Sequence, residues 1–448
     1  MAKNLNMTMG HPGKLLLAFA LPLMLGNVFQ QLYTVVDTAI VGQGVGMSAL
    51  AALGSVDWLN WLSLGIAQGF TQGFSVRMSQ RFGQGDGDGL RRAIGASARL
   101  AVMIAFAVTL IGQLSLEFLL DLLQVPVHLR SMAELYTRIL MAGIPAVMFY
   151  NFCASVLRAV GDSKTPLIAM AISALTNIVL DSVAVFVLGW GIAGAAAATV
   201  FSQLLSGAVC ASKMARSPML RFGKEDMRRD GRLNGDLLGL GAPIAIQNVV
   251  IAVGGIAVQS VINGFDTTFI AGYTASSKLY GVLEIAAISY GSAVTTYVGQ
   301  NYGAAQWERI RKGVRWAVIL SVATAAVIGG AMILFGRQIT MLFISSESAA
   351  EAAAAGETAY QFLCVMGGFL IVLYLLYAYR SALQGMGNTR IPLLSGIVEF
   401  VMRVGTAVII GLSGPQDGIF LAEVAAWIGA AVLLCISYYH DAGKMGRS

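Results

Sequence analysis

Charged residues are scarce in this chain. Of its 448 residues, only 12% are Asp, Glu, Lys or Arg, whereas 57% are hydrophobic. A soluble globular protein carries about 25% charged residues, so this composition excludes soluble enzymes and nucleic-acid-binding modules. A disordered or collagen-like chain is excluded as well, because hydrophobicity is high and the 52 glycines follow no Gly-X-Y period.

Cysteine and histidine are also rare. The four cysteines lie inside apolar runs without CxxC or Cys/His spacing, so neither a disulfide framework nor a zinc site is expected. The three histidines, His11, His128 and His440, lie near the termini or in a predicted outer loop. A membrane-embedded hydrolase would need such side chains inside its membrane spans. Because the histidines lie outside the predicted spans, we do not expect an enzyme.

What the chain does contain is long apolar segments. A membrane-spanning helix needs about 20 apolar residues, and the hydrophobic content suffices for about twelve of them with short polar joints. The sequence therefore predicts an all-α polytopic membrane protein. Hydropathy places the spans near residues 14–40, 48–75, 92–112, 132–156, 165–189, 192–212, 237–262, 268–297, 314–335, 359–383, 392–411 and 418–438.

Basic residues are distributed unequally among the joints. Of the 29 Lys and Arg residues, 22 lie in alternate joints or near the termini, and only Arg130 and Arg337 lie in joints on the opposite side. The positive-inside rule then predicts that both termini and the basic joints lie in the cytoplasm. Because the basic residues are spread over short joints, the net charge of +6 reflects topology, and no nucleic-acid partner is expected.

The longest basic joint runs from Lys213 to Asp236 and divides the spans into six and six. We therefore predict an amino-terminal six-helix lobe at 1–212, a cytoplasmic linker at 213–236 and a carboxy-terminal six-helix lobe at 237–448. The joint can equally be an ordinary basic loop.

The two halves are related in sequence. Leu157-Arg-Ala-Val-Gly-Asp162 reappears as Leu383-Gln-Gly-Met-Gly-Asn388, and Pro22 in the first span corresponds to Pro243 in the seventh. Because each half has an even number of spans, the repeats are parallel and related by a pseudo-twofold axis along the membrane normal, an arrangement typical of transporters. Pro22 and Pro243 are candidate hinges, with a static bend as the alternative.

Several motifs accompany this repeat. The first span contains Asn27-Val-Phe-Gln-Gln-Leu-Tyr-Thr-Val-Val-Asp-Thr-Ala-Ile-Val-Gly42. Ala159-Val-Gly-Asp-Ser-Lys-Thr-Pro166 is echoed by Gly385-Met-Gly-Asn-Thr-Arg-Ile-Pro392, and Val298-Gly-Gln-Asn-Tyr-Gly303 follows the eighth span. Together they resemble the multidrug and toxic compound extrusion (MATE) family over nearly the whole chain, in particular the bacterial and archaeal branches that include the DNA-damage-inducible F proteins.

The resemblance implies a rocker-switch antiporter that exports amphipathic, cationic drugs or metabolites in exchange for Na⁺ or H⁺, without another cofactor. It implies a bacterial inner-membrane location, a small-molecule substrate and the lipid bilayer as partners, and function as a monomer. The carboxy-terminal lobe departs from branches with an acid early in the seventh span, since Gln247 and Gln259 are the polar residues there. In the amino-terminal lobe, four residues match the ion site of the family, and they would hold Na⁺ if Na⁺ is the coupling ion. These residues are Asp37, Asn177, Asp181 and Thr199.

The residue types at these four positions suit a small cation. Two acids within spans cost about 5 to 7 kcal/mol together unless something compensates them. Asn177 and Asp181 are four residues apart and share one helix face. Carboxylate, amide and hydroxyl oxygens are the hard donors that Na⁺ prefers, and two close carboxyls that cannot both ionise cheaply would accept a proton instead. The alternative is a structural pair of hydrogen-bonded acids.

Polar and aromatic residues within spans are candidates for a substrate cavity, although most such residues are ordinary core. The candidates are Gln30, Tyr33, Thr34, Tyr150, Lys278, Tyr280, Glu399 and Arg403. Glu399 and Arg403 are four residues apart, and we predict that they pair and fix the eleventh span, with Lys278 nearer the cavity. Glu284 and Glu423 are further acids in spans, without an assigned partner.

Three other functions stay open. A flippase for lipid-linked sugars shares the repeat plan, but it should carry several basic residues in its cavity to bind pyrophosphate, and the chain offers mainly Lys278, Arg380 and Arg403. A membrane-embedded transferase would need a polar catalytic cluster at one interface, which the sequence does not supply. A channel is not favoured, because no filter motif is present.

Overall fold

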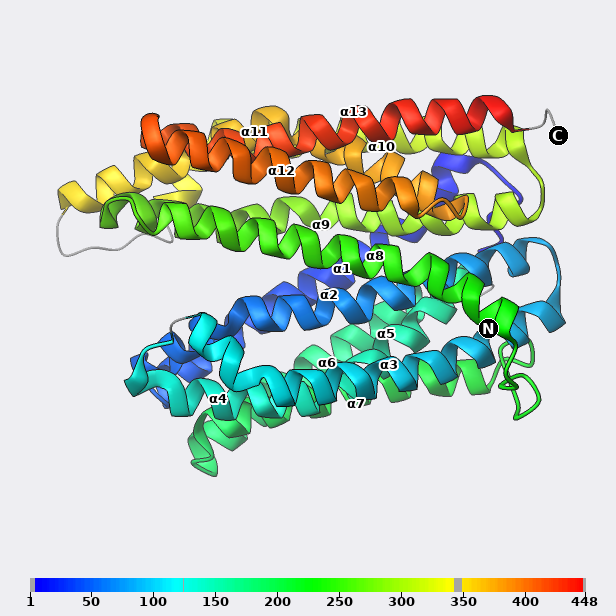
Figure 1. Ribbon diagram of the computed structural model, residues 1–448, viewed down its shortest axis with the longest axis horizontal. Coiled ribbons are helices and arrows are strands. Elements are labelled where there is room, and N and C mark those ends of the chain that lie inside the picture. The colour runs from blue at the N-terminus through cyan, green and yellow to red at the C-terminus, as the bar shows by residue number, and fades with distance from the viewer. Residues whose placement is uncertain (1–4, 124, 342–348, 446–448) are drawn as a thin grey trace. The chain divides into compact units, whose positions relative to one another are not determined.

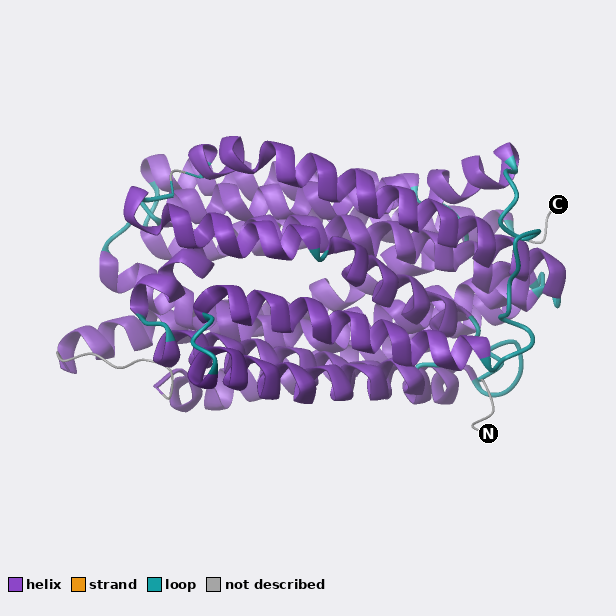
Figure 2. Ribbon diagram, turned by 90° about the horizontal axis from the view of Figure 1, so that it is seen from below, coloured by secondary structure: helices purple, strands orange, loops and turns teal. Residues whose placement is uncertain are grey.

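The computed structural model describes residues 5–123, 125–341 and 349–445, and these residues form helices joined by loops, without a strand (Figure 2). The predicted all-α fold is confirmed. In chain order (Figure 1), the elements are α1 (Pro12–Gly44), α2 (Met47–Gly83), α3 (Gly87–Leu122), α4 (Val127–Ala142), α5 (Ile144–Ala159), α6 (Lys164–Ser182), the π-helix η1 (Val183–Val187), α7 (Gly191–Ala215), α8 (Gly231–Ile262), α9 (Thr267–Gly303), α10 (Trp307–Met341), α11 (Ala349–Gly385), α12 (Arg390–Ser413), the 3₁₀-helix η2 (Gln416–Phe420) and α13 (Leu421–Lys444).

These helices account for the predicted spans. By length and composition, ten of the described helices could cross a membrane, or eleven if the bent pair α4 and α5 is one span. α9 is 37 residues long, and its length also suffices for a crossing. With α4 and α5, α6 and η1, and η2 and α13 each taken as one span, the order of elements matches the twelve predicted spans.

The fourth predicted span, 132–156, is not one straight helix, which corrects the prediction. α4 and α5 meet at Gly143 with a bend of 42°. Pro145 lies in the first turn of α5 and has no N–H to bond to the preceding turn, so a continuous helix would lose a hydrogen bond there. Hydropathy alone does not register this break.

The chain divides into two compact units. One contains the described residues of Met1–Met7 and Leu21–Asn248, and the other contains Thr8–Ala20 and the described residues of Val249–Ser448. The division falls within α1, just before Pro22, and within α8, shortly after Pro243. The predicted lobes, 1–212 and 237–448, follow the sequence repeat, whereas these units follow packing, in which the start of α1 joins the later helices and the start of α8 joins the earlier ones.

The internal repeat is visible in the backbone. α5 is followed by Gly161 with a φ of +87°, and α11 by Gly387 with a φ of +90°. In both loops the next amide donates to the carbonyl five residues back, at 2.9 Å for Asp162 and 3.0 Å for Asn388. This Schellman motif needs a residue in the left-handed backbone conformation after the helix, a position that favours glycine. Each repeat therefore ends its fourth span in the same way.

The predicted linker at 213–236 is fastened to the first unit. α7 ends at Ala215 and α8 begins at Gly231, so the connection between the two helices covers residues 216–230 and is shorter than the predicted linker. Arg99 of α3 donates to the Met227 carbonyl at 2.5 Å and to Asn234 Oδ1 at 2.7 Å. The segment is therefore held by specific hydrogen bonds.

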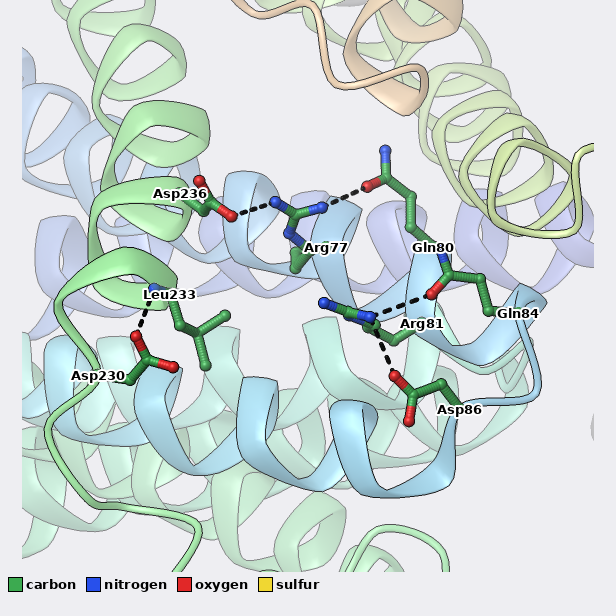
Figure 3. A network of polar contacts seen from close by, with 8 residues as sticks. All are labelled: Arg77, Gln80, Arg81, Gln84, Asp86, Asp230, Leu233 and Asp236. Atoms are coloured by element: carbon green, nitrogen blue, oxygen red, sulfur yellow. Dashed lines mark hydrogen bonds and ion pairs between the residues drawn. The ribbon is translucent and has the colours of Figure 1, made fainter.

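Basic residues of α2 contribute to the same end of this unit (Figure 3). Arg77 forms an ion pair with Asp236 of α8, and it also donates to Gln80 Oε1 at 3.4 Å. Arg81 pairs with Asp86 at 3.0 Å, at the turn between α2 and α3. Residues that served as topology signals in the sequence thus also connect helices.

Glycines on α2 allow α8 to approach closely. Gly65, Gly69 and Gly73 are spaced by four residues and share one helix face. A Cβ atom at Gly69 would collide with the backbone of Ala245, and one at Gly73 with the backbone of Gly241. Small residues of this spacing let helix backbones meet inside a membrane.

We expect Gly73→Ala to destabilise the protein by about 1 to 3 kcal/mol, because the added methyl group overpacks this contact. Gly54→Ala is the matched control on the same helix, since a Cβ atom there would meet nothing within 4 Å. Thermal unfolding in detergent measures both. Equal melting temperatures for the two variants would show that the close approach of α2 and α8 does not depend on glycine.

Candidate functional site

The first unit brings together the four residues of the predicted ion site. Asp37 lies on α1, Asn177 and Asp181 lie on α6, and Thr199 lies on α7. Asn177 Nδ2 donates to Thr199 Oγ1 at 3.5 Å. The Asp37 and Asp181 carboxyls lie close enough to share a hydrogen bond when one of them carries a proton. The four residues therefore form one cluster across three helices.

This cluster is buried and incompletely satisfied. Asp37 is 9% exposed, Asn177 is 1% exposed and Asp181 is fully buried. Among the described residues, no hydrogen-bond partner is present for Asp37 Oδ1, Asn177 Oδ1 or either carboxylate oxygen of Asp181, and no Lys or Arg pairs with the two acids. Buried oxygens without partners are costly, so the site fits a cation or a proton.

The donor set determines which kind of ion the cluster could hold. Within the parts of the chain that the structure describes, no group of three or more His, Cys, Asp or Glu side chains is arranged to bind a metal ion. An ion between Asp37 and Asp181 would therefore need the Asn177 and Thr199 oxygens as well. Such an all-oxygen site suits a hard cation such as Na⁺.

The backbone changes character directly after Asp181. α6 ends at Ser182, and Val183–Val187 form a single π-helical turn in which the amide of Leu188 donates to the Val183 carbonyl at 2.9 Å. Single π turns are rare and occur frequently at functional sites. This turn places an irregular helix end next to the most deeply buried acid of the unit.

Two tyrosines lie within electrostatic range of both acids. Tyr33 is one helical turn before Asp37 on α1, and Tyr136 lies on α4. Tyr33 was a predicted cavity residue, whereas sequence reasoning missed Tyr136. The signal for Tyr136 was weak, since one tyrosine in a predicted span resembles any other.

The other cavity candidates of this unit differ in their surroundings. Thr34 Oγ1 donates to the Gln30 carbonyl within α1 at 3.0 Å. Tyr150 packs in the hydrophobic core with residues such as Phe74 and Phe152, which is the ordinary-core alternative. A substrate-binding role for Gln30, Tyr33 and Thr34 stays a prediction.

In the second unit, the predicted ion pair between Glu399 and Arg403 is wrong. Both residues lie on α12, but Glu399 pairs with Arg380 of α11, and Arg403 Nη2 pairs with Glu423 Oε2 of α13 at 2.7 Å. α12 packs against both of these helices, and each of them supplies an opposite charge. The charges are therefore neutralised between helices rather than along one helix, and the two pairs fix α12 from two sides.

Glu284 of α9 is an acid of this unit that forms no ion pair with a described residue. Tyr280 donates to Glu284 Oε1 at 2.5 Å and stacks on Trp427, with ring centroids 6.0 Å apart. The Lys278 side chain lies outside the described part of the structure, so its predicted position near the cavity stays a prediction.

Double-mutant cycles test the observed pairing. Arg380→Met leaves Glu399 buried without its partner and should cost about 3 to 5 kcal/mol, whereas Arg380→Met with Glu399→Gln should be much milder. Arg403→Met and Glu423→Gln should couple in the same way. The cross-combination of Glu399→Gln with Arg403→Met is the control and should be closer to additive in thermal unfolding. A coupling there as large as within the observed pairs would restore the pairing predicted from the sequence.

Comparisons with known proteins agree with this architecture. The family model described as MatE matches residues 22–183 and 243–409, which is more than half of the chain. The chain is 29% identical to the Probable multidrug resistance protein YpnP of Bacillus subtilis over 427 residues, covering 95% of this chain and 92% of that protein. The two matched ranges correspond to the two halves of the repeat.

The chain is also similar to a transporter with a named substrate and to a solved structure. An FAD transporter of Shewanella oneidensis is 23% identical over 347 residues, covering 76% of each chain. A crystal structure of MATE in complex with MaL6 superposes with a TM-score of 0.92 at 23% identity and covers 100% of both chains. At that identity, the structural likeness shows the fold alone.

Proposed function

This chain belongs to the MATE family, and we propose that it is a secondary active antiporter that exports amphipathic, cationic compounds in exchange for Na⁺ or H⁺. It is a multi-pass membrane protein, and we propose that it works in a bacterial cytoplasmic membrane with both termini in the cytoplasm, as the unequal distribution of basic residues favours. Its role would be transport without chemical change of the substrate.

The observation that supports ion coupling is the set of buried oxygens at Asp37, Asn177 and Asp181 that have no hydrogen-bond partner among the described residues. Two close carboxylates in an apolar unit repel each other, and binding of one Na⁺ or one proton would relieve that repulsion. Removal of the ion restores the negative charge. The protein therefore has two charge states in this unit, and each can favour a different arrangement of α1 and α6.

Helix α1 would couple ion binding at Asp37 to the movement that exchanges substrate and ion. Asp37 is part of the first unit, and the division between the units crosses the same helix just before Pro22. Proline removes one helical hydrogen bond and weakens the helix locally. A change of charge at Asp37 would thus be transmitted along α1 to Pro22, next to the residue where the helix passes from one unit to the other, as a rocker-switch exchange requires.

The substrate class has one specific competitor. The similarity to an FAD transporter makes an anionic flavin nucleotide a second candidate. Against it, the first unit gathers uncompensated acids at Asp37 and Asp181, which attract cations. A flippase for lipid-linked sugars is a third possibility and would also require basic residues around a pyrophosphate group.

Ion coupling is tested with purified protein in vesicles loaded with ethidium, under an imposed Na⁺ gradient or an imposed pH gradient. Asp37→Asn and Asp181→Asn should each reduce gradient-driven ethidium efflux to the level of vesicles that contain no protein. The reason is that a neutral amide cannot alternate between two charge states. The gradient that drives efflux identifies the coupling ion.

Asp88→Asn is the control, since Asp88 is an exposed carboxylate at the start of α3 and should leave transport unchanged. Full efflux by the Asp37→Asn, Asp181→Asn double variant would contradict the proposed ion site. Transport of FAD or of lipid-linked sugars by the wild-type protein, without any efflux of lipophilic cations, would overturn the substrate class.

The hinge is tested by Pro22→Ala, which restores a helical hydrogen bond in α1 and should raise the melting temperature while it slows efflux. Pro12→Ala is the matched control, since Pro12 is the first residue of the same helix, where its missing N–H removes no helical bond. Unchanged efflux by Pro22→Ala would show that Pro22 is only a static bend.

A further inference from the structure

A groove lies on the first unit, away from the Asp37 cluster. Its volume is about 370 Å³, which is within the range of ligand pockets in proteins. α3, α5, α7 and the segment after α7 form its walls. The lining residues that determine its shape and charge are Ala98, Ala101, Ala105, Phe106, Phe149 and Arg221.

The shape of the groove follows from its residue types. Ala98, Ala101 and Ala105 lie three and four residues apart on one face of α3, so their small side chains leave a slot along the helix. Phe106 and Phe149 border the slot and are 63% and 37% exposed. The slot is therefore apolar and reaches the outer surface of the unit, where a membrane protein meets acyl chains.

One end of the groove is positively charged. Arg221 is its charged lining residue, and Arg221 Nε donates to the Ala215 carbonyl at 2.5 Å. No described residue accepts a hydrogen bond from either terminal nitrogen of Arg221. The surrounding segment, residues 213–230, contains six basic residues and three acids, so it is positively charged overall. The guanidinium is thus held in place by one nitrogen and offers the other two.

We propose that this groove binds an anionic phospholipid, with one acyl chain in the apolar slot and the phosphate at Arg221. An acyl chain matches the narrow alanine and phenylalanine walls, and a guanidinium binds phosphate oxygens through two parallel hydrogen bonds. Basic pockets between membrane helices are recurrent sites for anionic lipid headgroups. A lipophilic cation fits the slot but is repelled by Arg221, and free phosphate leaves the slot empty.

A lipid in this position would contact α3, α5, α7 and the segment that joins the two halves of the chain. That segment is already anchored by Arg99 through Met227 and Asn234. The bound lipid therefore adds a second attachment at the other end of the same connection.

The test uses purified, delipidated protein in detergent, titrated with phosphatidylglycerol or with phosphatidylcholine, and the rise in melting temperature gives the apparent affinity. Wild-type protein should bind phosphatidylglycerol roughly fivefold more tightly or better, as expected for one basic side chain near the headgroup. Arg221→Gln should remove this preference. Arg216→Gln is the control, because Arg216 is a basic residue of the same segment that does not line the groove.

Ala98→Phe fills the slot and should weaken binding of both lipids. If this variant does not fold, the comparison of Arg221→Gln with Arg216→Gln still decides, because both residues are exposed. Equal affinities of wild-type protein for the two lipids, or a preference that survives Arg221→Gln, would overturn the proposal. Displacement of phosphatidylglycerol by tetraphenylphosphonium, with Arg221→Gln binding the cation more tightly, would identify the groove as a drug site instead.

Discussion

Asp37 and Asp181 place two carboxyl groups side by side inside an apolar helical unit, and no Lys or Arg in the described parts of the chain pairs with either of them. Acids at membrane depth are expensive, about 2.5 to 3.5 kcal/mol each on insertion scales. The neighbouring Asn177 and Thr199 add oxygen atoms but no positive charge. We propose that a mobile cation compensates these acids, and that its binding and release would give the unit two charge states.

Two acids of the second unit, unlike Asp37 and Asp181, form ion pairs. Glu399 and Glu423 each pair with an arginine from another helix, Arg380 and Arg403, so their charge is permanently compensated. A buried pair is weak evidence for stability, but it holds the helices that carry it in a defined register. The first unit thus holds two buried acids that no described Lys or Arg pairs with, whereas Glu399 and Glu423 of the second unit are paired and its Glu284 accepts a hydrogen bond from Tyr280.

The sequence predicted the helical fold, the repeat and the Asp37 and Asp181 cluster, because hydropathy, spacing and family motifs report on them directly. The partners of Glu399 and Arg403 could not be predicted, since spacing along one helix says nothing about which neighbouring helix offers an opposite charge. The contact of Gly73 with α8 had a signal in its four-residue glycine spacing, which hydropathy windows overlook.

The central claim is that the Asp37 and Asp181 cluster binds the coupling ion, and equilibrium binding of that ion to purified protein in detergent tests it most directly. Radioactive Na⁺ binding and proton uptake, measured with a pH indicator, should together reveal one Na⁺ or one proton bound per chain. The Asp37→Asn, Asp181→Asn double variant should bind neither, with an unchanged circular dichroism spectrum. Undiminished ion binding by that folded double variant would contradict the account.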